Sequence, residues 1–142
     1  VAAMNGAGDT DVGIAGGIAK DLSGNSLQNS PEYSFNLGAQ YTFDLANGMS
    51  IVARTDYYYQ DDMYASIYNS PTQDRVDAWD VWNAQVTLNS ADESWYLRGF
   101  IQNILNEDHI TGQSIGDQST GLATTVFLLD PRLYGIEIGY RF

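Results

Sequence analysis

The chain has 142 residues and no cysteine, and its 18 acidic and 6 basic residues give a formal net charge of −12. This length predicts a single domain. The lack of cysteine excludes a disulfide framework and a cysteine metal site. The negative charge excludes a nucleic-acid footprint, because it repels phosphate. The single histidine, His109, excludes a multi-histidine site, and we expect it in a loop without a chemical role.

Five segments alternate apolar and polar residues with the period of two that predicts β-strands. They cover residues 33–44, 49–59, 79–88, 94–104 and 132–142. Residues 1–32 come first and predict a long loop. Asn47-Gly48 and residues 90–93 predict tight turns. Residues 60–78 and 105–130 predict two further long loops, and residues 123–129 of the second are apolar enough for a short extended piece.

Each predicted strand has one apolar face and one polar face. No charged residue lies in the middle of an apolar face, and six charged residues fall on the polar face. These residues are Asp44, Arg54, Asp56, Arg98, Glu137 and Arg141. An arginine that faced lipid at mid-membrane would cost about 2–4 kcal/mol, so a transmembrane barrel requires this separation. A soluble β-sandwich also separates its faces, and the separation alone therefore leaves both classes open.

Strand length and aromatic placement favour the membrane. A tilted strand needs about 9–11 residues to cross a bilayer, and the aromatic residues lie near the strand ends, as in the girdles of membrane barrels. We expect one girdle from Tyr41, Phe43, Trp95, Tyr140 and Phe142, and the other from Tyr33, Tyr57, Tyr59, Trp82 and Tyr134. Short turns also alternate with long loops, which is the pattern of periplasmic turns and extracellular loops.

Three segments resemble the TonB-dependent outer-membrane receptors. Residues 130–142 (DPRLYGIEIGYRF) are similar to the last strand of this family, with Pro-Arg, an aromatic residue, glycine, alternating apolar residues and a terminal phenylalanine. Pro31-Glu32-Tyr33 resembles the Pro-Glu with which a family strand begins. Residues 103–107 (NILNE) resemble the Asn-Leu-x-Asp/Asn-Glu motif, with Ile104 where leucine is usual. The resemblance covers about residues 24–142.

The resemblance implies an all-β fold: about the last five antiparallel strands of a large barrel of about 22 strands. Residues 1–32 would be an extracellular loop, residues 33–142 the strands with their loops, and the plug domain would be absent. Such a receptor sits in the outer membrane of a Gram-negative bacterium and imports a scarce nutrient such as siderophore-bound iron, cobalamin or a saccharide. Its partners would be membrane lipid, the rest of the barrel, the plug, the TonB complex, the assembly machinery and the nutrient, with no nucleic acid.

Several residues are candidates for specific roles. Phe142, Tyr140 and Ile138 resemble the C-terminal signal that the assembly machinery reads. Arg54, Asp56, Arg98 and Glu137 are expected on the lumen side, where they would contact the plug or pair with one another. Tyr58 has inward parity and, with Tyr64 and Tyr68, is a candidate for contact with the nutrient.

No catalytic, cofactor or metal site is expected, and the protein is not expected to be an enzyme. Ca²⁺ prefers oxygen ligands, but the spacing of four loop aspartates matches no calcium motif, and a solvated acidic loop is favoured. These aspartates are Asp61, Asp62, Asp74 and Asp77. Two other functions remain open: a small stand-alone outer-membrane barrel, for which eight strands suffice, and a soluble β-sandwich that binds carbohydrate.

Deletion of Phe142 is predicted to lower assembly of the barrel into the outer membrane, because it removes the terminal aromatic residue of the C-terminal signal. The measurement is the amount of heat-modifiable folded barrel in washed outer membranes. An unchanged amount would contradict the signal and leave Phe142 as an ordinary lipid-facing residue.

Overall fold

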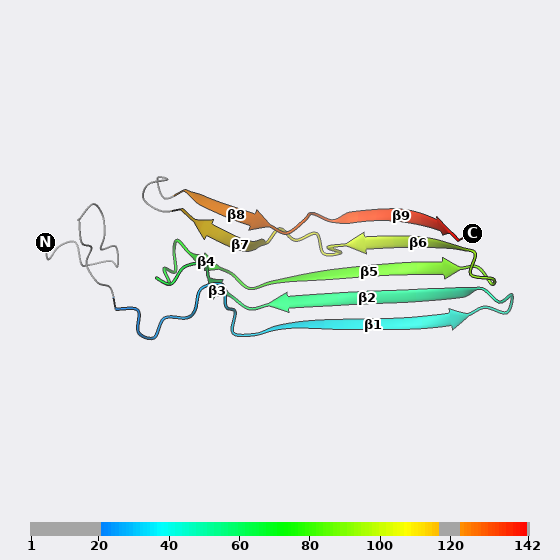
Figure 1. The fold of residues 1–142 in the computed structure, drawn as a ribbon, viewed down its shortest axis with the longest axis horizontal. Coiled ribbons are helices and arrows are strands. Elements are labelled where there is room, and N and C mark those ends of the chain that lie inside the picture. The colour runs from blue at the N-terminus through cyan, green and yellow to red at the C-terminus, as the bar shows by residue number, and fades with distance from the viewer. Residues whose placement is uncertain (1–20, 117–122, 142) are drawn as a thin grey trace, which may run out of the picture.

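The protein is an antiparallel β-structure built around one sheet of five long strands, in the order β1-β2-β5-β6-β9 (Figure 1). A computed structural model describes residues 21–116 and 123–141. The strands of the sheet are β1 (Ser34–Asp44), β2 (Ser50–Gln60), β5 (Trp79–Asn89), β6 (Trp95–Gln102) and β9 (Leu133–Tyr140). All five predicted strands are confirmed, and so is the all-β fold class. Within the described ranges, no helix is long and apolar enough to cross a membrane.

Two small hairpins lie at one end of the sheet, where the sequence predicts two long loops with a short extended piece in the second (Figure 1). One hairpin pairs β3 (Met63–Tyr64) with β4 (Arg75–Val76), and the other pairs β7 (Ile110–Ile115) with β8 (Thr124–Leu128). The sequence did not predict β3, β4 or β7, because these strands are too short or too polar to show a period of two. The extended piece predicted at residues 123–129 is confirmed as β8.

Tight turns close the opposite end of the sheet. In the turn after β1, Gly48 has a φ of 83°, which glycine adopts without strain, and its amide donates to the carbonyl of Leu45. In the turn after β5, the Asp92 carboxylate accepts hydrogen bonds from the hydroxyls of Ser90 and Ser94. These bonds favour the charged form and lower the pKa of Asp92 to about 2, so the turn keeps its carboxylate contacts in all but strongly acidic solution.

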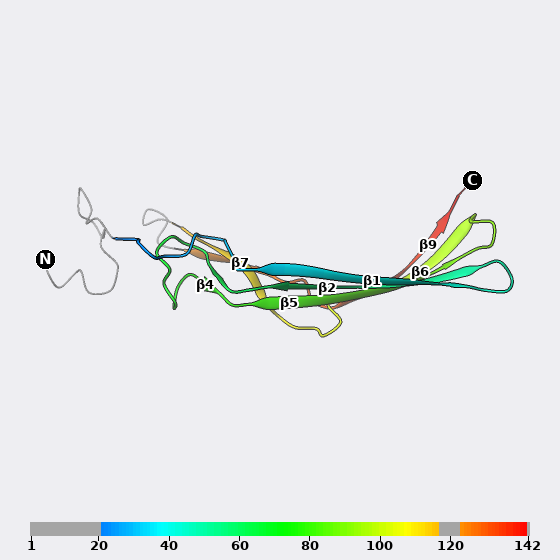
Figure 2. The ribbon, with the colours of Figure 1, turned by 90° about the horizontal axis from the view of Figure 1, so that it is seen from below.

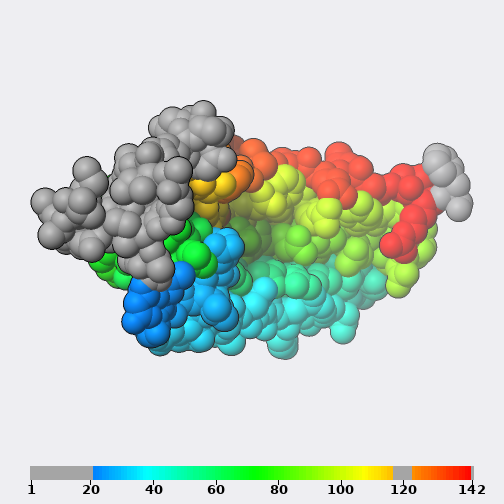
Figure 3. Space-filling view, turned by 60° about the vertical axis from the view of Figure 1, so that its left-hand side comes forward, coloured from blue at the N-terminus to red at the C-terminus, as the bar shows by residue number. Residues whose placement is uncertain are grey.

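On β5, β6 and β9, the exposure of the two faces of the sheet is the reverse of that in a soluble protein. On the apolar face, Ile136 and Ile138 are 77% and 76% exposed. On the opposite face, the side chains of Arg98 and Glu137 are only 35% and 38% exposed. Figure 2 shows that the sheet is curved, and Figure 3 shows a hollowed side with the middle strands at its floor. A hydrocarbon solvent on the apolar side accounts for this arrangement, because each exposed apolar group then needs no protein cover.

The sheet has no second layer packed upon it among the described residues. Their only buried apolar side chains are Met63 and Val76, and both belong to the small β3–β4 hairpin. The two edge strands, β1 and β9, each pair with one neighbour only. The sheet is therefore open, and neither its apolar face nor its edges are satisfied within the described chain.

Both expected aromatic girdles come together at the strand ends. At the loop end, Tyr33 stacks on Tyr59 with ring centroids 5.7 Å apart, and Tyr57 meets the edge of Trp82 at 6.4 Å. At the turn end, Trp95 pairs directly with Tyr140 across β6 and β9. Phe142 and residues 1–20 of the predicted first loop lie outside the described residues, and residues 21–32 contain no strand.

We predict that Val86→Arg destabilises the folded barrel by about 2–4 kcal/mol, because Val86 is half exposed on the apolar face near the middle of β5. Val52→Arg is the matched control. Val52 pairs with Thr42 and Thr87 on the opposite face, one residue pair away along the sheet. Its arginine would face the polar side and cost much less. Urea unfolding of the receptor in lipid measures both, and equal losses would contradict the assignment of the faces.

Candidate functional site

The polar face carries two groups of paired charges. In the first, Arg54 donates from Nε and Nη2 to the two carboxylate oxygens of Asp56, each at 2.8 Å. This two-point geometry is the strongest form of the arginine–carboxylate pair. Gln40 on β1 and Gln85 on β5 stand directly across from Arg54, so the pair sits within a row of polar side chains.

The second group joins β6 to β9. Glu137 accepts hydrogen bonds from the Tyr96 hydroxyl and from Arg98 Nη2. Glycines on β9 make room for the aromatic rings of β6. A Cβ on Gly139 would overlap the ring of Tyr96, and a Cβ on Gly135 would lie 2.7 Å from Cζ of Phe100. Both rings therefore lie against the bare backbone of β9, next to the charged pair.

The four residues predicted to face the lumen all lie on this polar face and form two ion pairs, Arg54–Asp56 and Arg98–Glu137. This geometry favours the second of the two expected roles, in which they pair with one another. Contact with a plug stays a prediction.

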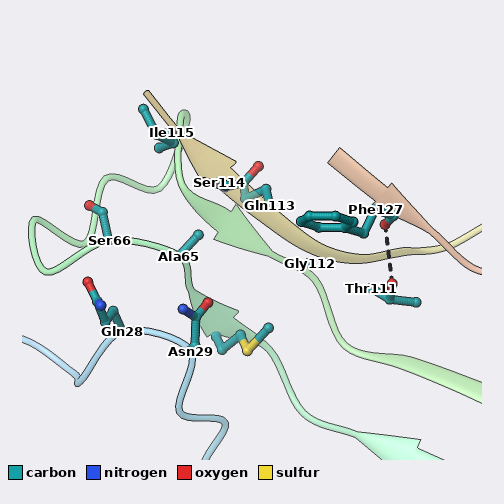
Figure 4. Close-up of a pocket in the computed structure, with 11 residues that line it drawn as sticks. Gln28, Asn29, Ala65, Ser66, Thr111, Gly112, Gln113, Ser114, Ile115 and Phe127 are labelled. Carbon is teal, nitrogen blue, oxygen red and sulfur yellow. Dashed lines mark hydrogen bonds between the residues drawn. The ribbon is translucent and has the colours of Figure 1, made fainter. Parts of the chain in front are cut away.

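A hollow with a volume of about 610 Å³ opens among the loops, at the end of the sheet opposite the tight turns (Figure 4). Segments that are far apart in sequence form its wall. They are Gln28 and Asn29 before β1, Met63 with Ala65 and Ser66 around β3, residues 111–115 in β7, and Phe127 in β8. The hollow thus lies where both small hairpins meet the segment that leads into β1.

Backbone and amide hydrogen bonds hold this wall together. The Asn29 amide donates to the carbonyl of Tyr64 at 2.7 Å. Gln113 Nε2 donates to the carbonyl of Gln73 at 3.1 Å, which ties β7 to the β3–β4 connection. Within the second hairpin, the Thr111 hydroxyl donates to the carbonyl of Phe127 at 3.2 Å (Figure 4).

The hollow offers neutral polar groups and one aromatic ring. Amides come from Gln28, Asn29 and Gln113, and hydroxyls come from Ser66, Thr111 and Ser114. Among the described residues that line it, none is charged and the ring of Phe127 is the one aromatic surface. Such a wall suits a neutral ligand with many hydroxyl groups, because amides and hydroxyls can both donate and accept hydrogen bonds.

The three tyrosines predicted as ligand contacts are not among the described residues that line the hollow. Tyr58 packs against Trp79 with ring centroids 5.1 Å apart, and its hydroxyl donates to Gln60. Tyr64 lies between the lining residues Met63 and Ala65, and Tyr68 is 48% exposed in the β3–β4 connection. Their role in ligand contact stays a prediction.

The four loop aspartates are not gathered into one cluster. Arg75 lies 3.4 Å from Asp62 and 3.5 Å from Asp77, and it neutralises part of their charge. Asp74 is 1% exposed and accepts a hydrogen bond from the Ser66 hydroxyl. This arrangement follows from the β3–β4 hairpin, which the sequence does not reveal.

Sequence reasoning missed a different group of residues, Asp80, Glu107 and His109. Their carboxylate oxygens and imidazole nitrogen lie within 4.8 Å of one another. Asp80 comes from β5, whereas the other two come from the connection between β6 and β7. Asp80 stands at the start of the predicted strand 79–88, and Glu107 and His109 follow the end of the predicted strand 94–104. Nothing in the sequence indicates that these two places meet in space.

Comparison with known proteins decides the family. The family described as TonB dependent receptor-like, beta-barrel matches residues 5–104, which is more than half of the chain. This chain belongs to that family. No curated protein and no solved structure matches it significantly.

Family membership explains the two faces of the sheet. TonB-dependent receptor barrels lie in the outer membrane of Gram-negative bacteria and serve as receptors and transporters, not as a class of enzymes. The apolar face then meets lipid and the charged pairs face away from it. The family match selects this class over a stand-alone small barrel and over a soluble β-sandwich.

We predict that Gly139→Ala lowers the free energy of unfolding of the TonB-dependent receptor by about 1–3 kcal/mol, because the new methyl group displaces the ring of Tyr96, whose hydroxyl donates to Glu137. Gly99→Ala is the control, since a Cβ on Gly99 meets open space. Urea unfolding in lipid measures both. The same loss in a Tyr96→Leu background would show that crowding of this ring is not the cause.

Proposed function

We propose that this chain forms a sector of the barrel wall of a TonB-dependent importer whose nutrient is a saccharide. The sequence left open siderophore-bound iron, cobalamin and saccharides. The observation that favours the last is the wall of the hollow, which combines three side-chain amides, three hydroxyls and the Phe127 ring with no charged residue among its described members.

The chemistry of sugars matches this wall. A saccharide presents many hydroxyl groups, each of which donates and accepts hydrogen bonds, and its C–H surfaces pack on aromatic rings. A neutral wall also favours a ligand that carries no compensating charge, since buried charges require partners. The strongly acidic chain as a whole, with its net charge of −12, would repel an anionic chelate.

The open sheet supports a place for this chain within a larger barrel. In our proposal, further strands pair with β1 and β9 and complete a barrel of about 22 strands around a plug. The loop end faces the cell exterior, because long loops of such barrels are extracellular. The polar face lines the lumen, where the Arg54–Asp56 and Arg98–Glu137 pairs stand toward the plug. Energy for import would come through TonB.

The test is calorimetric titration of the whole receptor with neutral oligosaccharides, alongside ferric siderophores and cobalamin. Phe127→Ala is expected to weaken oligosaccharide binding about tenfold, because it removes the stacking surface. Val126→Ala is the control, since Val126 is its neighbour in β8 and is not among the lining residues. Binding of a siderophore or cobalamin and of no oligosaccharide would overturn the proposal.

A further inference from the structure

We propose that Asp80, Glu107 and His109 form a divalent transition-metal site at the loop end of the barrel wall, on the lipid-facing side. The site would fasten the β6–β7 connection to the start of β5. It is separate from the hollow, with which it shares no residue, and the inference does not depend on which nutrient the receptor imports.

The donor set has the chemistry of a zinc-type site. One imidazole nitrogen and two carboxylate oxygens are ligands that Zn²⁺ and similar divalent ions accept. The distance from His109 Nε2 to the Glu107 carboxylate is 2.9 Å, and all three donor atoms lie within 4.8 Å of one another. Ligands around a tetrahedral ion with bonds of about 2.0 Å are roughly 3.3 Å apart. A small side-chain movement of Asp80 therefore completes the geometry.

The backbone around each ligand is held in place. Asn103, which is 3% exposed, donates from Nδ2 to the carbonyl of Glu107 at 2.9 Å and accepts from the Glu107 amide at 3.2 Å. The carbonyl of His109 accepts from the amide of Leu129 at 2.8 Å. Asp80 lies in β5, directly across from Tyr59. The backbone around the ligands is thus already ordered, so binding of an ion would cost little conformational entropy.

Two further contacts bring the halves of the site together. The Ile104 amide donates to the carbonyl of Trp82 at 2.8 Å, which fixes the start of the β6–β7 connection against β5. The Tyr57 side chain interacts electrostatically with Asp80, and a neighbouring hydroxyl of this kind can orient a metal-binding carboxylate. Asp80 is two residues before Trp82 on the same face of β5, so the site stands just beyond the aromatic girdle of Tyr57 and Trp82.

Three ligands leave at least one coordination position to solvent or to a further group. Glu107 is half exposed, whereas the His109 side chain is only 24% exposed. An ion bound here would replace the direct His109–Glu107 contact with two metal bonds and would add a third bond to Asp80. It would thus link β5 to the connection that leads into β7, one wall of the hollow.

The experiment titrates the whole receptor in detergent with ZnCl₂ by calorimetry, and with CoCl₂ by visible absorption. Wild-type receptor is expected to bind one Zn²⁺ at this site and to show a Co²⁺ band of nitrogen and oxygen ligation. Asp80→Asn and His109→Gln are each expected to weaken binding about tenfold or more and to abolish the band. Ca²⁺ should not compete, because it is not matched to imidazole.

Asp108→Asn is the matched control, because Asp108 lies between two of the ligands and its change removes the same charge as Asp80→Asn. It should leave Zn²⁺ binding within about twofold of wild type. Equal weakening by Asp108→Asn would indicate diffuse attraction and overturn the site. No Zn²⁺ binding by wild type, or binding that ignores His109→Gln, would also overturn it. Oligosaccharide titration of the same variants reports separately on the proposed import function.

Discussion

The structure depends on one constraint, which is that a strand alternates its side chains between two sides while its backbone must hydrogen-bond to neighbouring strands. In a bilayer no water satisfies an unpaired backbone group, so a sheet is stable there only when it closes into a barrel. The alternation of side chains along each strand then places apolar groups against lipid and charged groups toward the barrel interior. The exposed Ile136 and Ile138 and the paired Arg98 and Glu137, all on β6 and β9, are direct results of this division.

The strand ends can carry polar side chains and irregular backbone, because they lie outside the hydrocarbon layer. Beyond the aromatic girdle the chain meets water and can turn, fold into hairpins and present polar groups. The neutral hollow and the Asp80–Glu107–His109 group both lie at this boundary. Asn103 controls much of it, since its φ of 48° ends β6 and its side chain holds Glu107 and the carbonyl of Asp130. Residues 103–107 thus end β6 and also contribute Glu107 to the Asp80–Glu107–His109 group.

The long strands were predictable because each repeats a period of two over many residues, and the faces followed from the same pattern. The family followed from residues 130–142, 31–33 and 103–107. The hairpins were not predictable, since Met63 and Val76 pair across a stretch of polar sequence. The hollow and the Asp80–Glu107–His109 group depend on which strand ends meet in space, and one sequence does not contain that information in any local pattern.

The glycines of β9 also bear on how its partner is aligned. Alternation forbids a slip of one residue, because every side chain would change sides, but it permits a slip of two. On the polar side, β6 carries Tyr96, Arg98 and Phe100. In the register of the sheet they lie opposite Gly139, Glu137 and Gly135 of β9, in that order. A shift of two residues in either direction would set an aromatic ring against Glu137 and leave Arg98 opposite a glycine. The aromatic rings that face glycines and the arginine that faces a glutamate therefore favour a single alignment of β9 against β6.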